Sequence, residues 1–196
     1  MDSPAGRKEL THQRIVEAAA RAIRRAGFAG VGVADIMKDA GLTHGGFYAH
    51  FASRDALLCE ALAHAGRDGS ARLVKGVGGA KRQQSNAFRA LVEGYLSERH
   101  LRSTESGCAI AALACEMPRQ APEVRAVAAL SVRSLVSSIR QTLPPGHAAE
   151  NAAVVAGQLV GALQLARTLG DNAEGRKLLA VTRQALLAHF EPAQSG

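Results

Sequence analysis

The chain has 196 residues and carries 24 Lys and Arg against 17 Asp and Glu, a formal net charge of +7 at neutral pH. Apolar residues make up 47%, which excludes disorder throughout, and the low aromatic content of 4% without Trp predicts a core of packed helices. We find neither a signal-peptide centre nor an apolar run near the roughly 20 residues that span a bilayer, so we expect a cytoplasmic protein without membrane contact.

More than half of the excess of positive charge lies in one short part of the chain. Residues 67–83 contain five Lys and Arg against one Asp, whereas the first 66 residues are nearly balanced. A net positive charge favours binding to a polyanionic partner such as a nucleic acid. The charge alone, however, does not single out any N-terminal segment as a nucleic-acid site.

Four helices are predicted in the first third of the chain. Apolar residues at helical spacing predict a helix over residues 9–26, with Thr11 as a cap and Gly27 at its end. A short helix over 33–40 and a glycine turn at Gly41 follow. Thr43 can cap a third helix, and Ser53 a fourth. The apolar stripe of the fourth helix reaches to about residue 65, and glycines beyond residue 66 predict a frayed end or linker there.

The remaining chain is also predicted to be helical. We expect helices over 85–101, 108–117, 122–143, 148–169 and 173–190, the third of these beginning at Pro122. No segment shows the period of a strand. The fold class is therefore all-α, with about nine helices.

The stretch GLTHGGFYAHF, residues 41–51, is too rich in glycine for a stable helix and too rich in aromatic residues for an ordinary loop. It follows a short helix and a glycine turn, which is the pattern of a helix-turn-helix. Residues 9–65 resemble the DNA-binding domain of the tetracycline repressor (TetR) family. The resemblance is carried by Asp35-Ile36, by Ala40 to Thr43, by the run GFYAHF at 46–51 and by SRDALL at 53–58.

The resemblance implies a fold, a function and partners. It implies a three-helix helix-turn-helix domain over residues 1–52, with the start of a fourth helix reaching to about 65, and a helical effector-binding and dimerisation domain over 53–196. It implies a ligand-responsive repressor that binds double-stranded DNA as a homodimer on a palindromic operator. An unidentified small molecule is the expected effector, and no cofactor or metal is expected.

Candidate DNA contacts lie around the predicted recognition helix. Thr43, His44, Gly45 and Tyr48 are the candidates for base contacts, since the start of a recognition helix reaches base edges. Candidates for phosphate contacts are Arg14, Lys38, His50 and Arg54. His50 has an alternative role, which is to satisfy a carbonyl inside the domain.

Three other positions in this region have expected structural roles. Phe47 and Phe51 lie four residues apart, so we expect both rings in the core. Gly32 stands where the family usually has Thr or Ser as a helix cap, and a glycine lacks the hydroxyl that could reach a DNA phosphate there.

The last two predicted helices suit dimerisation, because they carry small residues and an apolar ridge. The interface candidates are Ala153, Ala156, Gly157, Gly161, Leu179, Leu186 and Phe190. The alternative is that these faces pack within one subunit. By the same resemblance the middle helices enclose an effector pocket, whose candidate polar residues are Tyr95, Glu116, Arg133 and Gln164.

Other readings remain open at this point. Cys108 and Cys115 lie seven residues apart on one predicted helix, which allows either a redox role or two buried, inert thiols. A metal site at Cys59, Glu60 and His64 is disfavoured, because such a Glu/His pair is common on helix surfaces. The competing functions are a helical interaction module without DNA binding and a small enzyme. No nucleophile elbow, phosphate loop or HExxH motif supports the enzyme.

Overall fold

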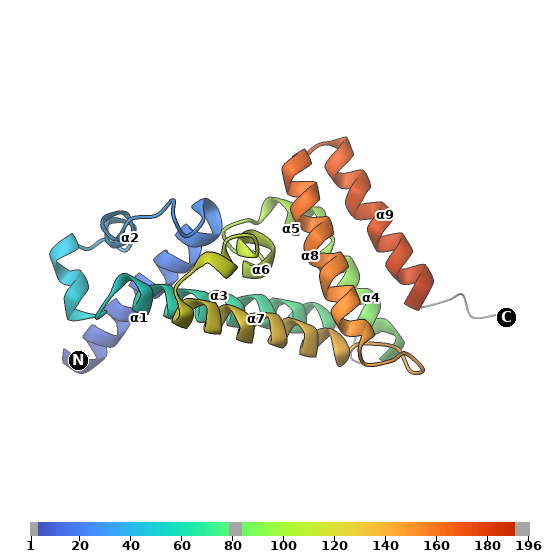
Figure 1. Cartoon of the computed structure of the whole chain (residues 1–196), viewed down its shortest axis with the longest axis horizontal. Helices are drawn as coiled ribbons and strands as arrows, with labels where there is room; N and C mark the ends of the chain where they lie inside the picture. The colour runs from blue at the N-terminus through green and yellow to red at the C-terminus, as the bar shows by residue number, and fades with distance from the viewer. Residues whose placement is uncertain (1–3, 79–83, 191–196) are drawn as a thin grey trace. The chain divides into compact units, whose positions relative to one another are not determined.

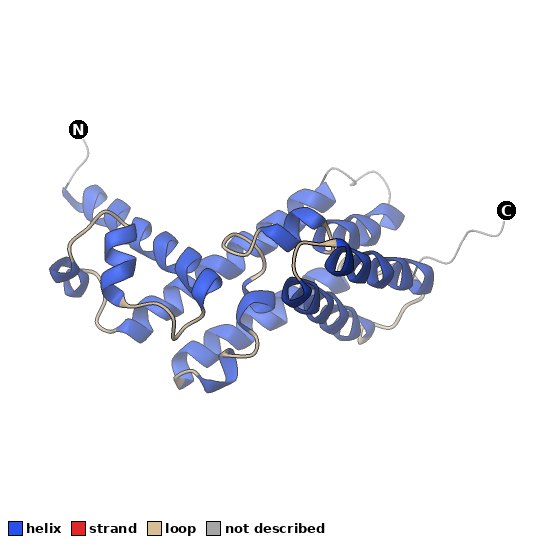
Figure 2. Cartoon of the chain, turned by 90° about the horizontal axis from the view of Figure 1, so that it is seen from above, coloured by secondary structure: helices blue, strands red, loops and turns tan. Residues whose placement is uncertain are grey.

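A computed structural model of the chain describes residues 4–78 and 84–190, with side chains at 6–69 and 87–190. Over these residues the chain is helical and contains no strand, which confirms the predicted all-α class (Figure 2). The chain forms two compact units: one comprises residues 1–67 and 105–131, and the other residues 68–104 and 132–196. The boundary predicted at residue 52 is a different division and stays a prediction.

The first unit begins with helix α1, Pro4–Ala26, which starts earlier than predicted. Thr11 is therefore not a cap; its hydroxyl donates to the carbonyl of Arg7 one turn earlier. Small and branched side chains on one face are buried, among them Ile15, Ala19 and Ile23. The helix ends as predicted at Gly27, whose φ of 78° is a conformation that L side chains rarely adopt.

Helix α2, Val33–Asp39, and the 3₁₀ helix η1, His44–Ala49, follow α1, and helix α3, Arg54–Gly78, comes next (Figure 1). Ser53 caps α3 as predicted, since its hydroxyl oxygen accepts from the N–H of Ala56 at 3.0 Å. The predicted end of this helix near residue 66 is wrong, because α3 continues to Gly78. A Cβ at Gly66 would lie 3.1 Å from Ser131 Oγ, so this glycine permits a close approach between helices instead of ending one.

The single helix predicted over 85–101 is divided into α4, Gln84–Tyr95, and α5, Glu98–Arg102. Ser97 starts α5, because its hydroxyl oxygen accepts from the N–H of His100. The helix predicted over 108–117 is reduced to α6, Ala109–Leu113, followed by the 3₁₀ turn η2, Met117–Arg119. Helix α7, Pro122–Arg140, begins at the proline, as predicted.

The second unit is completed by α8, Asn151–Leu169, and α9, Ala173–Phe190, which pack side by side (Figure 1). Gly175 permits this packing, since a Cβ there would lie 2.8 Å from the carbonyl oxygen of Ala166 on α8. Among the described residues α8 alone is long and apolar enough to span a membrane, although a core helix passes the same test of length and composition.

Replacing Gly27 with alanine tests the end of α1. An alanine there must adopt a positive φ, and its Cβ would overlap the carboxylate oxygen Oε1 of Glu116. We expect Gly27→Ala to lower the free energy of unfolding by about 1–3 kcal/mol. Chemical denaturation measures the change. The control is Gly94→Ala in α4, where a Cβ meets nothing within 4 Å; equal losses in both variants would contradict the account.

Candidate nucleic-acid interface

The turn between α2 and η1 is fixed by backbone hydrogen bonds. The N–H of Leu42 donates to the carbonyl of Met37 at 2.8 Å, and the N–H of Gly41 donates to that of Lys38 at 2.9 Å. These two bonds form a Schellman motif, which requires a left-handed residue after the helix. Gly41 supplies it with a φ of 71°. The predicted glycine turn is confirmed, and it directs the chain straight into residues 43–49.

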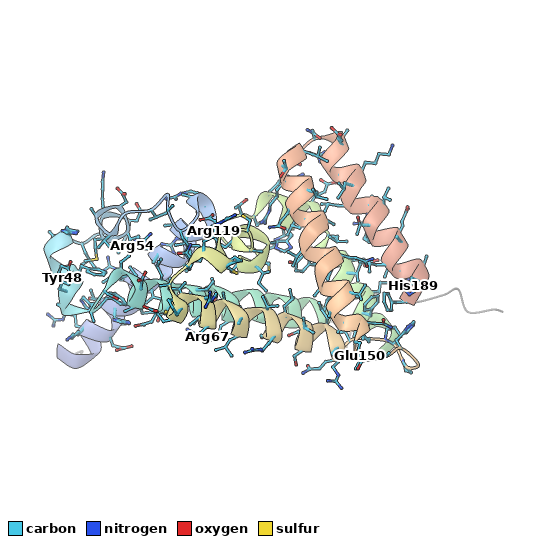
Figure 3. All side chains as sticks on the ribbon, viewed as in Figure 1. Tyr48, Arg54, Arg67, Arg119, Glu150 and His189 are labelled. Atoms are coloured by element: carbon cyan, nitrogen blue, oxygen red, sulfur yellow. The ribbon has the colours of Figure 1, made fainter. Side chains whose placement is uncertain are left out.

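The predicted recognition helix is a 3₁₀ helix and not an α-helix. Thr43 occupies the position before its first residue, as predicted, but its side chain makes no capping hydrogen bond. A 3₁₀ helix has three residues per turn, so His44 and Tyr48 do not share the common face that an α-helix would give them. Both side chains are exposed, with Tyr48 at 75% (Figure 3). Thr43, His44 and Tyr48 thus remain accessible to an external partner.

Two phenylalanines attach η1 to the core of the unit. Phe47 and Phe51 are 2% and 3% exposed, and their rings stack with centroids 5.6 Å apart. Phe51 also stacks on the ring of His12 from α1 at 4.5 Å. The expectation that both phenylalanines belong to the core is confirmed. Burial of two such side chains contributes about 3–6 kcal/mol, which is how a six-residue helix is held in place.

Neither glycine in η1 is explained by the fold. Gly45 is exposed, its φ is not positive, and a Cβ added there would meet nothing within 4 Å. At Gly46 a Cβ would make only an ordinary contact, 3.6 Å from Met37 Cε. Glycine lowers helix stability relative to alanine by about 1 kcal/mol per residue. No contact or backbone angle among the described residues therefore requires a glycine at position 45.

The four predicted phosphate contacts differ in their surroundings. Lys38 is exposed in the last turn of α2. Arg14 and Arg54 are directed instead to backbone carbonyls of the unit: Arg14 Nη2 donates to Ala40 O, and Arg54 Nη2 donates to Phe28 O and Val31 O. No partner in the structure tests a phosphate contact at any of these positions, so the contacts stay predictions.

His50 ends η1 beside a second histidine. Its ring centroid lies 5.9 Å from that of His12, whose Nε2 is 2.7 Å from Glu60 Oε2 on α3. The Nδ1 atom of His50 is buried and has no hydrogen-bond partner among the described residues. Burial, together with His12 and Lys8, lowers the pKa of His50. The alternative prediction, in which His50 satisfies an internal carbonyl, is therefore wrong for Nδ1.

The predicted pocket residues are not gathered in one unit. Tyr95 and Gln164 belong to the second unit, with Tyr95 1% exposed, whereas Glu116 belongs to the first. Glu116 Oε2 accepts the N–H of Phe28 at 2.9 Å, so its carboxylate supports the end of α1. Arg133 is exposed on α7. An effector pocket built from these residues stays a prediction, although Glu116 already has a structural role.

The helices α8 and α9 carry an open apolar groove of about 710 Å³. Gly157 and Gly161 line it, together with three residues that sequence reasoning missed: Val154, Leu165 and Val181, each more than half exposed. Their spacing offered a signal, because Val154, Gly157, Gly161 and Leu165 form one stripe along α8.

The remaining interface candidates do not form an exposed ridge. Leu179, Leu186 and Phe190 are at most 4% exposed and belong to the core of their own unit, which corrects that expectation; Leu186 and Phe190 also border the groove. Phe190 packs on Phe88 with ring centroids 5.2 Å apart. Ala156 is buried, and Ala153 is exposed outside the groove.

The expectation that Cys108 and Cys115 share one helix is wrong, because neither residue lies within α6. Cys108 precedes α6 and Cys115 follows it, and Cys115 is exposed, so the reading of two buried thiols is wrong for that residue. Burial, followed by Glu123, Asp55 and Glu60, raises the pKa of Cys59, which disfavours the thiolate that metals bind. In residues 4–78 and 84–190 no three His, Cys, Asp or Glu are grouped to hold a metal ion.

With this geometry established, comparison with known proteins decides the family. Residues 15–61 match the family described as bacterial regulatory proteins, tetR family. An HTH-type transcriptional regulator of Mycobacterium tuberculosis is 30% identical over 170 residues, which cover 81% of this chain and 85% of that protein. The chain belongs to the tetR family. It is a DNA-binding transcriptional regulator, as the resemblance implied.

Solved structures of the tetR family share the fold. A TetR transcriptional regulator of Chloroflexus aurantiacus is 22% identical with a TM-score of 0.76, covering 93% of this chain and 95% of that chain. NemR of Escherichia coli in its reduced form is 20% identical with a TM-score of 0.74, covering 89% and 95%. The structural likeness extends over both units, whereas the family match covers only residues 15–61.

The environment of His50 predicts how stability depends on pH. Because the folded state lowers its pKa, the unfolded chain takes up a proton more readily, so acid favours unfolding. We expect the contribution of His50 to the free energy of unfolding to fall as the pH drops below about 6.5, the ordinary histidine pKa. The fall should continue until the pH reaches the lower pKa that His50 has in the folded state. Denaturation between pH 5 and 8 measures it. In His50→Gln this part of the decline should be absent; an unchanged decline would contradict the assignment.

Proposed function

We propose that this regulator presents η1 to the major groove of an operator, twice, as a homodimer on a palindromic site. The observation that carries the proposal is Gly45, which is exposed and required by neither packing nor conformation. Beside it lie Thr43, His44 and Tyr48, all accessible. Without a Cβ, the backbone at Gly45 approaches the DNA closely while the three side chains reach base edges or phosphates.

Pairing through α8 and α9 supports this geometry. A six-residue helix makes few base contacts, and two-fold pairing onto half-sites one turn apart supplies the rest. The exposed apolar residues of the groove lie beside glycines, where a second pair of helices can approach closely. The occupant we propose is the same face of a second copy, which makes a four-helix interface.

The further steps of the proposal concern regulation and location. We propose that a small-molecule effector binds the helical part of the chain in a state that holds DNA weakly, and that the chain acts as a repressor in the cytoplasm. An effector of this kind shifts the equilibrium only by its difference in affinity between the two states. The tetR family is generally non-enzymatic, and we propose that this chain too acts by binding and not by catalysis.

Gly45→Ala separates DNA binding from stability. The added methyl meets no atom of the chain, so we expect unchanged or slightly higher stability, by up to about 1 kcal/mol. If the backbone at Gly45 lies against DNA, the same methyl weakens operator binding about tenfold or more. Gel shifts with fragments of the regulator's own upstream region measure the affinity.

The control for this test is Gly94→Ala, which has equally open surroundings in α4 and lies outside η1. It should bind the operator as the parent does. A Gly45→Ala variant with parental affinity would contradict the close approach. Failure of the parent to select any fragment would favour the interaction module without DNA binding.

Val181→Asp tests the homodimer. Val181 is 55% exposed in the single chain, so the variant should fold normally, but a carboxylate in an apolar interface is strongly disfavoured. We expect light scattering at micromolar concentration to give a dimer for the parent and a monomer for Val181→Asp. Gln184→Asp, an exposed position of α9 outside the groove, should stay dimeric. A dimeric Val181→Asp variant, or a monomeric parent, would refute this interface.

A further inference from the structure

We propose that Arg14 and Arg54 are positioning residues that hold the two ends of α2 and thereby aim η1 at the operator, and that neither contacts a DNA phosphate. The proposal rests on the function proposed for η1 and concerns residues that the sequence pattern assigned to the phosphate backbone. Each arginine comes from a different helix, Arg14 from α1 and Arg54 from the start of α3.

Arg14 closes the C-terminal end of α2. Its Nη2 donates to the carbonyl oxygen of Ala40 at 2.6 Å, a short, charge-assisted hydrogen bond in a partly buried place. The carbonyls of Met37 and Lys38 are already satisfied by the Schellman motif, and that of Ile36 by the N–H of Ala40. The guanidinium thus takes one of the carbonyls that helix geometry leaves without a partner.

Arg14 also lies directly on the turn that leads into η1. A Cβ on Gly41 would be 3.1 Å from Arg14 Nη2, so the guanidinium packs against the backbone of this glycine. Only Leu42 separates Gly41 from Thr43, the residue before η1. Any rotation of the Ala40–Gly41 peptide is therefore passed on to the first predicted base contacts.

Arg54 holds the segment that precedes α2. Its Nη2 donates to the carbonyl oxygen of Phe28 and, at 3.3 Å, to that of Val31. The N–H of Phe28 is held in turn by Glu116 Oε2 at 2.9 Å. In the loop between α1 and α2, Glu116 therefore accepts from a backbone N–H group and Arg54 donates to backbone carbonyl groups.

Helix α2 needs such external support. It has seven residues, and its N-terminal cap position is Gly32, which has no side chain to cap with. Isolated helices of this length are unstable in water, so the orientation of α2 is set by its surroundings. Ile36 and Met37 attach one face to the core, and the arginines fix the two ends. Lys38, in contrast, is exposed and is the matched candidate for a phosphate contact.

Positioning and phosphate contact predict different results for DNA binding. A phosphate contact strengthens binding to any sequence, and its loss lowers the slope of log affinity against log salt by about 0.9. A positioning residue acts only where the base contacts must align. Its loss weakens operator binding and leaves non-specific affinity and the salt slope unchanged.

The experiment compares Arg14→Met and Arg54→Met with Lys38→Met, each measured on operator and on scrambled duplex from 50 to 200 mM salt. For both arginine variants we expect operator affinity to fall about tenfold, as for the loss of one charge-assisted hydrogen bond, with unchanged scrambled-duplex affinity and unchanged slope. Lys38→Met should weaken both duplexes equally and lower the slope by about 0.9.

Equal loss on both duplexes with a lower slope in Arg14→Met or Arg54→Met would overturn the assignment of that residue. Circular dichroism establishes that each variant is folded at the assay temperature. Where a Met variant is unfolded, Arg14→Lys or Arg54→Lys replaces it: positioning predicts weaker operator binding at unchanged scrambled-duplex affinity, and a phosphate contact predicts that both affinities are retained. If the parent itself shows no preference for any upstream fragment, the proposed function fails, and the proposal built on it falls too.

Discussion

The burial of Phe47 and Phe51 is the interaction on which the DNA-binding unit depends. Six residues in a 3₁₀ helix have no stability of their own, and two of the six are glycine. The stacked rings attach η1 to α1 through His12 and leave the opposite side of the backbone to solvent. A glycine that would weaken an independent helix is tolerated here, because packing and not helix propensity holds the segment.

This arrangement separates two tasks within one short stretch of sequence. Phe47 and Phe51 are buried and fix the position of the segment, whereas the side chains of Thr43, His44 and Tyr48 are exposed and Gly45 has open space around it. Arg14 and Arg54, at the two ends of α2, also face inward, since their guanidinium groups donate to backbone carbonyls of the protein. Fewer exposed cations are then left to attract DNA, which agrees with the nearly balanced charge of the first 66 residues.

The sequence predicted those features that depend on one residue and its immediate neighbours, such as helix ends. Gly27, Gly41 and Ser53 end or begin helices because their backbone freedom or their hydroxyl satisfies a helix end, and these assignments are confirmed. The element type of η1 was missed, because a few residues carry no period that distinguishes a 3₁₀ helix from an α-helix. The break at Ser97 was missed for a similar reason, since the apolar pattern continues through it while the hydroxyl caps α5.

Other features depend on contacts between distant residues and have no local signal. Gly66 resembles a helix breaker in sequence, yet it lies inside α3 where Ser131 approaches closely. The apolar positions of α9 are visible in the sequence, but only the fold shows that Leu179 is covered by its own chain and Val181 is not. The inward direction of Arg14 and Arg54 is likewise a property of the fold, because a cation near a recognition helix suits a phosphate equally well.

The most direct test of the central claim, that η1 enters the DNA, is photo-crosslinking from its outward side. A benzophenone amino acid at position 48 replaces an exposed ring, and the same probe at position 119 is exposed in the same unit but lies outside η1 (Figure 3). The account predicts a crosslink from position 48 to an operator fragment that unlabelled operator removes by competition, and none from position 119. Equal crosslinking from both positions, or from position 119 alone, would contradict it.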